Sequence, residues 1–288
     1  MSDTLKVALV QKRCGPRSED NLESAVAAVD AAARSGAQVL CLPELFRAPY
    51  PCQSEDVARF DLAEPVPGPS TEELGAAAAR NRMVIIASLF ERRAPGLCHN
   101  SAVILDADGK IAGLYRKMHI PDDPGYFEKF YFAPGDLGFG AHETAAGRVG
   151  VLVCWDQWFP EAARAVALDG AWVLFYPTAI GWASGEPEAA RRRQREAWET
   201  IQRGHAIANG MFVAAVNRVG TEEGLEFWGS SFVADPFGEV IARARCDREE
   251  LMLVECDRTL VETTRRHWPF LRDRRIDAYQ DLARRFRS

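Results

Sequence analysis

Short apolar runs alternate with longer amphipathic segments along the chain, a pattern typical of strands interleaved with helices. Residues 21–34 carry Leu22, Ala25 and Val29 at helical spacing, which predicts a helix there. The other segments with a helical pattern are residues 71–82, 160–168 and 188–208. The apolar runs that predict strands are residues 6–10, 39–42, 84–90, 149–153, 172–176, 212–216 and 251–255.

Two further pairs of apolar runs flank short turn sequences and predict hairpins. Asp108-Gly109 separates residues 101–105 from residues 111–115. A Pro- and Gly-containing turn, residues 235–238, separates the second pair, which lies within residues 231–242. Strands, helices and hairpins that are interleaved in this way indicate a layered α/β fold with a mixed sheet. The chain shows no internal repeat or low-complexity linker, so we expect one domain over residues 1–288.

The composition limits the classes of protein that this chain can belong to. Apolar residues make up 47% of its 288 residues, enough for a large core, and the net charge is −6. A negative charge argues against a broad nucleic-acid-binding surface. The basic run Arg191-Arg192-Arg193 is expected on the solvated face of a helix. Neither a leader sequence nor an apolar window of about 18 residues is present, so we expect a cytoplasmic protein with no membrane or nucleic-acid partner.

The seven cysteines do not form a recognisable framework. Their number is odd and no pair has C-x-x-C spacing, which argues against a disulfide scaffold and a structural zinc site. We expect most of them to be buried, reduced thiols. The cysteines are Cys14, Cys41, Cys52, Cys98, Cys154, Cys246 and Cys256.

Three of the predicted strands are followed closely by a reactive side chain. These side chains are Glu44, Lys117 and Cys154. Ligands of open α/β sheets gather at strand ends, so the three positions are candidates for one site. Each alone is weak evidence, because a glutamate after a strand is usually solvated and a buried cysteine is usually structural.

The sequence around these three residues resembles the nitrilase superfamily of carbon–nitrogen hydrolases. The matching stretches are Leu42-Pro43-Glu44, Tyr115-Arg116-Lys117-Met118-His119 and Cys154-Trp155-Asp156. The similarity covers nearly the whole chain. It implies a four-layer αββα sandwich with mixed β-sheets and a Glu–Lys–Cys triad. No cluster of His, Cys and acidic residues has the spacing of zinc ligands, so we expect no metal or other cofactor. The similarity also implies a homo-oligomer, a dimer or a multiple of dimers, to which a C-terminal segment at about residues 257–288 contributes contacts.

The residue types suit hydrolysis through a cysteine-bound acyl intermediate. A thiol needs a base to become nucleophilic near pH 7, and Glu44 can accept the proton of Cys154. Lys117 and the backbone N–H of Trp155 can stabilise the oxyanion that forms. The resemblance also implies that a second glutamate, Glu128, orients Lys117 and the substrate, although Glu128 alone also suits a surface loop.

The longest stretches of similarity are shared with N-carbamoylputrescine amidases. These stretches are residues 119–126, 128–136, 154–164, 176–181 and 270–275. The resemblance implies that the substrate is a small carbamoylated amine, and we expect it to be N-carbamoylputrescine. The ammonium end of this substrate needs an acidic or aromatic partner in the pocket, because a buried cation without one is costly. The residues that we expect at the substrate are Trp155, His119, Tyr126, Asp156, Trp158 and Thr178. His119 suits a structural, hydrogen-bonding role equally well.

Other functions stay open at this stage. Trp182-Ala183-Ser184-Gly185 and Met118 depart from the expected amidase pattern, which puts the exact substrate in doubt. β-Ureidopropionase, N-carbamoyl-amino-acid hydrolase and ω-amidase activities are the alternatives within the family. An acyltransferase and a catalytically silent binding protein are alternatives of another class, although the intact triad argues against the silent protein. None of the five histidines lies in a protease-like signature that would favour cysteine–histidine catalysis.

Overall fold

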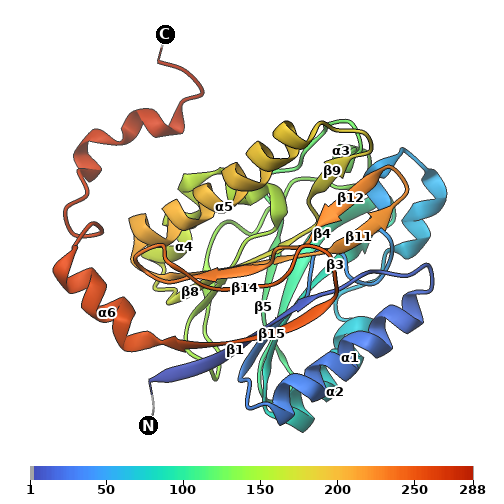
Figure 1. Ribbon diagram of the computed structural model, residues 1–288, viewed down its shortest axis with the longest axis horizontal. Helices are drawn as coiled ribbons and strands as arrows, with labels where there is room; N and C mark the ends of the chain where they lie inside the picture. The colour runs from blue at the N-terminus through green and yellow to red at the C-terminus, as the bar shows by residue number, and fades with distance from the viewer. Residues whose placement is uncertain (1–2, 288) are drawn as a thin grey trace.

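Two six-stranded sheets form the centre of the molecule in the computed structural model, which describes residues 3–287 (Figure 1). The first sheet has the order β15-β1-β2-β3-β4-β5 and the second has the order β14-β13-β10-β8-β7-β6. The strands of the first sheet are β1 (Thr4–Gln11), β2 (Val39–Cys41), β3 (Val84–Ala94), β4 (Leu97–Leu105), β5 (Ile111–Arg116) and β15 (Glu250–Asp257). The strands of the second sheet are β6 (Ala141–His142), β7 (Val149–Val151), β8 (Val173–Thr178), β10 (Phe212–Asn217), β13 (Phe232–Ala234) and β14 (Val240–Arg243).

Both sheets are mixed, as expected. The central strands β1, β2 and β3 pair in parallel, as do β7, β8 and β10, whereas the outer strands pair antiparallel. Helices cover the two outer faces, with α1 and α2 on one side and α4 and α5 on the other (Figure 1). The helices are α1 (Ser18–Arg34), α2 (Pro69–Asn81), α3 (Glu128–Tyr131), α4 (Pro160–Leu168), α5 (Glu188–Asn209) and α6 (Arg258–His267).

Strand β1 shows how the sequence pattern produces the layers. Its side chains alternate between the two faces of the sheet. Val7 and Leu9 belong to the core between the sheets, whereas Ala8 and Val10 pack with the apolar faces of α1 and α2. All four are buried, which accounts for the nearly continuous apolar run. The order helix, sheet, sheet, helix confirms the expected four-layer αββα sandwich.

A third, small sheet was not predicted from the sequence. It has the order β11-β12-β9 and consists of β11 (Val219–Glu222), β12 (Leu225–Trp228) and β9 (Gly181–Ala183). Its strands are three or four residues long and mix polar with apolar positions, so they lack the long apolar runs of the main sheets. Short 3₁₀ segments complete the secondary structure: η1 (Pro51–Gln53), η2 (Val57–Leu62), η3 (Cys154–Trp158), η4 (Ile276–Ala278) and η5 (Gln280–Ala283).

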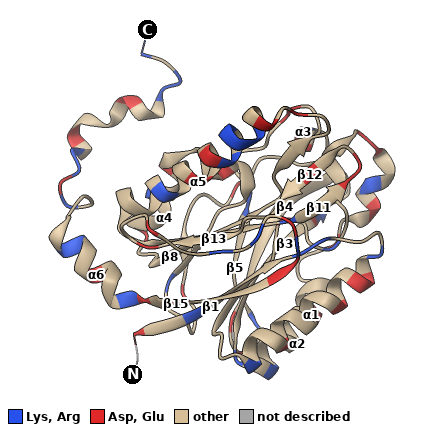
Figure 2. Cartoon of the chain, in the orientation of Figure 1, with Lys and Arg blue, Asp and Glu red and all other residues tan. Residues whose placement is uncertain are grey.

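The C-terminal part of the chain leaves the body of the sandwich (Figure 1). The charged segment after β15 begins with α6, a helix that the sequence pattern did not predict. Figure 2 shows that the charged residues lie mainly on α1, α5, α6 and the loops, with both signs interspersed, while the strands carry few. No helix between residues 3 and 287 has the length and apolar character that a membrane span requires.

Candidate active site

Four reactive side chains meet at one end of the sandwich, and we refer to them as the catalytic cluster: Glu44, Lys117, Glu128 and Cys154. Glu44 follows β2, Lys117 follows β5, Cys154 begins η3 after β7, and Glu128 begins α3. The two sheets therefore each contribute to the site from their strand ends, as ligand sites of α/β sheets commonly do. Three of the four side chains are completely buried and Cys154 is 4% exposed.

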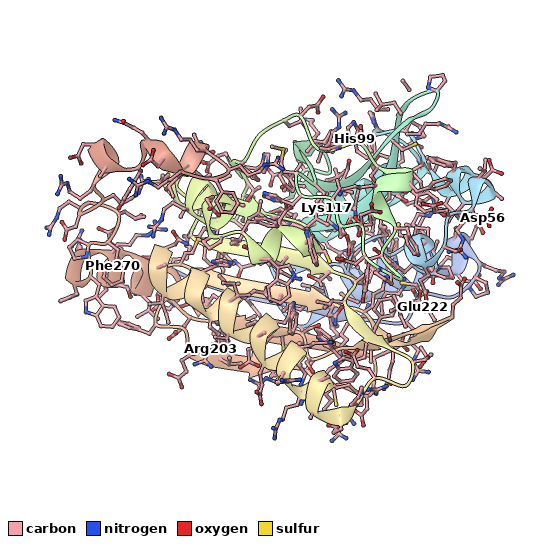
Figure 3. All side chains as sticks on the ribbon, turned by 90° about the horizontal axis from the view of Figure 1, so that it is seen from above. Asp56, His99, Lys117, Arg203, Glu222 and Phe270 are labelled. Carbon is pink, nitrogen blue, oxygen red and sulfur yellow. The ribbon has the colours of Figure 1, made fainter. Side chains whose placement is uncertain are left out.

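Lys117 lies at the centre of the catalytic cluster, in the interior of the molecule (Figure 3). Its Nζ donates to Glu44 Oε1 at 2.9 Å and to the two carboxylate oxygens of Glu128 at 2.8 and 2.7 Å. A buried ammonium is costly unless charged partners surround it, and here two carboxylates do so. Within the described residues Glu44 Oε2 is buried and makes no hydrogen bond, so this oxygen is free to accept a proton.

Two polar residues that the sequence reasoning missed hold the carboxylates in place. Asn100 Nδ2 donates to Glu44 Oε1 at 2.7 Å, and Tyr50 OH donates to Glu128 Oε1 at 2.6 Å. Asn100 lies in β4, where every residue after Leu97 is buried, and it stands beside two other polar residues, His99 and Ser101. A polar amide inside such a strand must find a buried partner, and this signal was available in the sequence.

Cys154, the candidate nucleophile, occupies an unusual backbone conformation. Cys154 has φ of +44°, a left-handed backbone conformation that residues other than glycine seldom adopt. The sharp turn comes at the first residue of η3, which two residues separate from the end of β7, and it leaves Sγ 4.0 Å from the Ala179 carbonyl oxygen. Strain of this kind concentrates at functional sites because the surrounding structure must enforce it.

The buried charges also determine the protonation states. Burial raises the pKa of the Cys154 thiol well above its ordinary value, and the adjacent Glu44 carboxylate raises it further. Burial lowers the pKa of Lys117, but Glu128 and Glu44 together raise it well above its ordinary value. Burial raises the pKa of Glu128 to about 7, although Lys117 opposes this shift. The resting site therefore holds a neutral thiol and a charged lysine, so the thiol needs a base to react.

A cavity of about 430 Å³ opens above Cys154 and forms the pocket of the site. Its walls are mainly aromatic and apolar, with Asp123, Glu186 and Gln194 as the polar side chains. No Lys, Arg or His side chain lines it in the part of the chain that the structure describes. The lining residues are Pro121, Asp123, Pro124, Tyr126, Cys154, Trp155, Trp158, Ile180, Gly181, Ala183, Glu186, Gln194, Ala197, Leu225 and Trp228.

Three of the six expected substrate-binding residues line this pocket: Trp155, Tyr126 and Trp158. The Trp155 and Trp158 rings meet edge to face with centroids 6.5 Å apart, so they form a continuous aromatic wall. The Tyr126 hydroxyl accepts from the backbone N–H of Gly181 at 2.9 Å and thereby connects two other lining residues of the pocket. Glu186, a pocket acid on the loop between β9 and α5, was not singled out from the sequence.

Asp156 does not line the pocket, and we correct its expected role. Its carboxylate is completely buried and accepts hydrogen bonds from Tyr115 OH, from the Val153 N–H, and from both the backbone and the ring of His119. With these four bonds made, the carboxylate has no free face for an ammonium group. Asp156 instead stabilises the turn that carries Cys154.

His119 and Thr178 also lie behind the pocket wall. The His119 ring stacks on Phe159 with centroids 3.7 Å apart, in addition to its bond to Asp156. Thr178 Oγ1 is buried and contacts Gln157 Oε1 at 3.3 Å and the Tyr176 carbonyl at 3.0 Å. Both side chains are therefore engaged with neighbouring residues of the fold, and for His119 the structural alternative agrees with its contacts.

A larger groove of about 630 Å³ lies beside α5 and β14, away from the catalytic cluster. Four arginines line it, and three of them pair with acidic side chains in the same groove: Arg243 with Glu199 at 2.6 Å, Arg245 with Asp247 at 3.0 Å, and Arg203 with Glu199 at 3.7 Å. Cys154 lies in the smaller, apolar cavity, which identifies that cavity as the candidate active site.

Comparison with known proteins agrees with this geometry. The carbon-nitrogen hydrolase family model matches residues 6–266. The chain belongs to this family and is a hydrolase that acts on carbon–nitrogen bonds.

Individual relatives extend the similarity over the whole chain. N-carbamoylputrescine amidase of Oryza sativa subsp. japonica is 42% identical, covering 96% of this chain and 94% of that protein. Citrullinase of Francisella tularensis subsp. tularensis is 39% identical, covering 98% and 99%. The crystal structure of a carbon-nitrogen hydrolase from Helicobacter pylori G27 superimposes with a TM-score of 0.95 at 47% identity, covering 99% of this chain and 100% of that one.

Proposed function

We propose that this hydrolase converts N-carbamoylputrescine and water to putrescine, carbon dioxide and ammonia. The observation that carries the proposal is the character of the pocket above Cys154. Two carboxylates, Asp123 and Glu186, lie on its walls, and the described lining contains no cationic side chain. An alkyl ammonium group suits such a pocket, because carboxylates and aromatic faces both attract cations.

The two named relatives frame the choice of substrate. N-carbamoylputrescine and citrulline carry the same ureido group and differ at the far end, where citrulline adds a carboxylate beside its ammonium group. A carboxylate inside a pocket requires an Arg or a similar donor to offset its desolvation. The pocket offers acids instead, which supports a substrate with a cationic end alone. The same argument disfavours carbamoyl-β-alanine and other carbamoyl amino acids.

The catalytic cluster suits the first half of the reaction. Cys154 Sγ attacks the carbamoyl carbon while its proton passes to Glu44 Oε2, the carboxylate oxygen that is free of other bonds. A new sulfur–carbon bond forms, and the carbonyl oxygen becomes an oxyanion. Lys117 and the Trp155 backbone N–H stabilise that charge. The carbon–nitrogen bond then breaks, and the departing amine takes the proton from Glu44.

Water completes the reaction on the thiol-bound intermediate. Glu44, again ionised, accepts a proton from the water as it attacks the carbon, and passes this proton to the Cys154 sulfur as the sulfur–carbon bond breaks. The carbamic acid that is released then loses carbon dioxide by cleavage of its remaining carbon–nitrogen bond, which frees the second amine. Glu128 does not meet the reacting atoms in this scheme. Its two bonds to Lys117 orient the ammonium group, and its negative charge keeps Lys117 protonated.

A substrate panel tests the proposal. The panel contains N-carbamoylputrescine, citrulline, carbamoyl-β-alanine and N-butylurea, a neutral analogue with a similar apolar chain, and the readout is ammonia release. We expect N-carbamoylputrescine to exceed each of the others in kcat/KM by more than about tenfold, or ~1.4 kcal/mol of transition-state discrimination. Equal or faster turnover of citrulline or carbamoyl-β-alanine overturns the amine assignment and leaves the family assignment intact.

We further propose that the protein is a cytoplasmic homo-oligomer. All seven cysteines are free, which suits a reducing compartment. The C-terminal segment exposes large apolar side chains as it leaves the body, among them Trp268 at 46% and Phe270 at 44% exposure, and Figure 3 shows Phe270 at the end of the molecule remote from Glu222. A second copy of the chain is the partner that we expect to cover them. Light scattering should give the mass of a dimer or a multiple of dimers, and a monomer at micromolar concentration overturns this proposal.

A further inference from the structure

Arg218 is a completely buried cation that lies outside the pocket. It occupies the single position between β10 and β11, directly after an apolar strand. Burial of a guanidinium group is costly, and replacing a buried ion pair by apolar residues often costs no stability. Stability alone therefore does not explain why an arginine is buried here, and its hydrogen bonds indicate its role.

Three of these bonds go to the backbone that carries the catalytic base. Arg218 Nε and Nη2 donate to the Glu44 carbonyl at 3.1 and 3.0 Å, and Nη2 also donates to the Leu45 carbonyl at 2.6 Å. Leu45 has φ of +49°, so the chain turns sharply immediately after Glu44. The guanidinium group thus fixes two successive carbonyls of a strained turn, a task that suits its planar array of donors.

A second set of contacts connects Arg218 to the other glutamate of the catalytic cluster. Arg218 Nη1 donates to Glu222 at 2.9 Å, and Glu222 accepts from the backbone N–H of Tyr50. The Tyr50 hydroxyl in turn donates to Glu128. Both glutamates that surround Lys117 are therefore connected to Arg218, Glu44 through its own backbone and Glu128 through Glu222 and Tyr50.

The adjacent residue Asn217 has a parallel role on the opposite side of the site. Asn217 Nδ2 donates to the Ile180 carbonyl at 3.0 Å, and Asn217 Oδ1 accepts from the Ile180 N–H at 3.0 Å. Ile180 lines the pocket and follows Ala179, whose carbonyl lies beside Cys154 Sγ. Consecutive residues at the end of β10 therefore connect the segment that carries the base with the segment beside the nucleophile.

We infer that Arg218 is a positioning residue that sets the location of the Glu44 carboxylate relative to the Cys154 thiol. The inference rests on the proposed role of Glu44 as the general base. A base must lie within hydrogen-bond reach of the proton that it accepts, and a misplacement of about 1 Å can lower the rate by about 10²-fold. Arg218 lies outside the pocket, so its replacement should change proton transfer and leave substrate binding intact.

Two variants test the inference, so that the test does not rely on the correct folding of a single variant. Arg218→Lys keeps the charge but lacks the planar donors that contact both carbonyls and Glu222 together. The double variant Arg218→Gln with Glu222→Gln removes both charges, so that neither is left buried and unpaired. The matched control is Arg265→Gln, because Arg265 also contacts two backbone carbonyls, those of Asn209 and Ala171, far from the catalytic cluster.

The measurements separate positioning from stability. The final extent of Cys154 alkylation, read by mass spectrometry of the peptide that contains it, counts the intact sites, and kcat is expressed per intact site. The initial rate of alkylation reports how well the base assists the thiol. We expect kcat per site and the alkylation rate to fall by at least about tenfold in each Arg218 variant that folds, with KM changed less than about threefold. Arg265→Gln should keep both values.

The outcomes also distinguish this inference from the proposed function. A smaller fall in kcat per site in the folded Arg218 variants, or a change in KM larger than the change in kcat, overturns the positioning role. Glu44→Gln is measured alongside, and its full activity would instead reject the base role on which the inference rests. A nearly inactive Glu44→Gln together with an unaffected Arg218→Lys rejects the positioning role alone.

Discussion

The catalytic cluster and the outer part of the pocket differ in how firmly their charged groups are held. In the catalytic cluster, Glu44, Lys117 and Glu128 are completely buried, and Lys117 alone makes three charged hydrogen bonds of 2.7–2.9 Å. In the outer pocket, Asp123 is exposed and Glu186 is half-buried, and both lie on loops. The charged groups of the catalytic cluster are therefore buried and bonded to one another, whereas those of the outer pocket are partly exposed and lie on loops.

This difference indicates that the reaction and the choice of substrate are encoded separately. A buried network loses much when one member changes, because its remaining charges are left unpaired in a low dielectric. Loops at the edge of a rigid scaffold tolerate substitution and commonly determine specificity. Relatives named for carbamoylputrescine and for citrulline are both about 40% identical to this chain, which agrees with a constant reaction and a variable outer pocket.

The largest expected effect lies in the catalytic cluster. Cys154→Ala removes the nucleophile with little change in volume, so turnover should disappear while the melting temperature stays close to that of the wild type. Glu44→Gln and Lys117→Ala should each lose at least about 10²–10³-fold in kcat, because they remove the proposed base and the proposed oxyanion cation. Ammonia release from the best substrate is the measurement.

Trp158→Phe is a suitable control for these variants, since it changes the pocket wall and leaves the catalytic cluster intact. More than a tenth of the wild-type rate in a homogeneous preparation of Cys154→Ala would contradict the proposed mechanism.

The next effect concerns pH and Glu128. Burial raises the pKa of Glu128 to about 7, so this residue takes up a proton as the pH falls through that value. Protonation removes one of the two carboxylate charges that surround and orient Lys117, so kcat should fall on the acid side of about pH 7. Glu128→Gln should lower the plateau of kcat by about 10–10²-fold and move the acid limb to lower pH. The pH profile of kcat under saturating substrate is the measurement.

The same shift in pKa affects folding with a definite sign. The pKa of Glu128 is higher in the folded protein than its ordinary value of 4.5, so the folded state binds more protons between that value and about 7. The contribution of Glu128 to the free energy of unfolding is therefore present below pH 4.5 and is lost as the pH rises to about 7. Denaturant titrations should show this loss in the wild type and not in Glu128→Gln. Identical pH dependence of the two proteins would show that Glu128 has no raised pKa.

The sequence predicted the two regions unequally, for physical reasons. Apolar runs such as residues 149–153 predicted the main sheets, because strands buried on both faces have few polar positions. The small sheet of β9, β11 and β12 was missed because its short strands take their stability from neighbours. Trp182 in β9, for example, stacks against Arg191 of α5 at 5.1 Å and packs on Trp228.

The candidate site shows the same division. Glu44, Lys117, Glu128 and Cys154 each stand in a recognisable local sequence, and the structure brings all four together. Asp156 illustrates the limit, because proximity to the nucleophile in the sequence did not reveal that its carboxylate points toward Tyr115 and His119. Side-chain direction depends on tertiary contacts, which spacing alone does not encode.

A moderate effect is expected in the outer pocket. Glu186→Gln removes a carboxylate from the wall while keeping its shape, so KM for N-carbamoylputrescine should rise by about tenfold, or ~1.4 kcal/mol, with little change in kcat. N-butylurea has no ammonium group, so its KM should change little. Steady-state kinetics with both substrates measures the difference.

Asp123→Asn is the matched comparison in the outer pocket. Asp123 is more exposed than Glu186, and solvent weakens its attraction for a cation, so the rise in KM should be smaller than for Glu186→Gln. An equal loss for N-butylurea and N-carbamoylputrescine in Glu186→Gln would reject a charge contact at this position.

The smallest expected effect, no change at all, concerns metal ions. The two carboxylates of the catalytic cluster already enclose the ammonium group of Lys117 at 2.7–2.9 Å, so a divalent ion could bind between them only by displacing a buried lysine. No group of three or more His, Cys, Asp or Glu side chains elsewhere in residues 3–287 is placed to hold such an ion. Prolonged chelation should therefore leave kcat and KM unchanged, whereas alkylation of Cys154 should remove activity. Loss of activity on chelation and recovery on addition of zinc would show that the positive charge at the reacting carbonyl is not supplied by Lys117 alone. The catalytic cluster would then not be self-contained, and the contrast drawn between it and the outer pocket would be wrong.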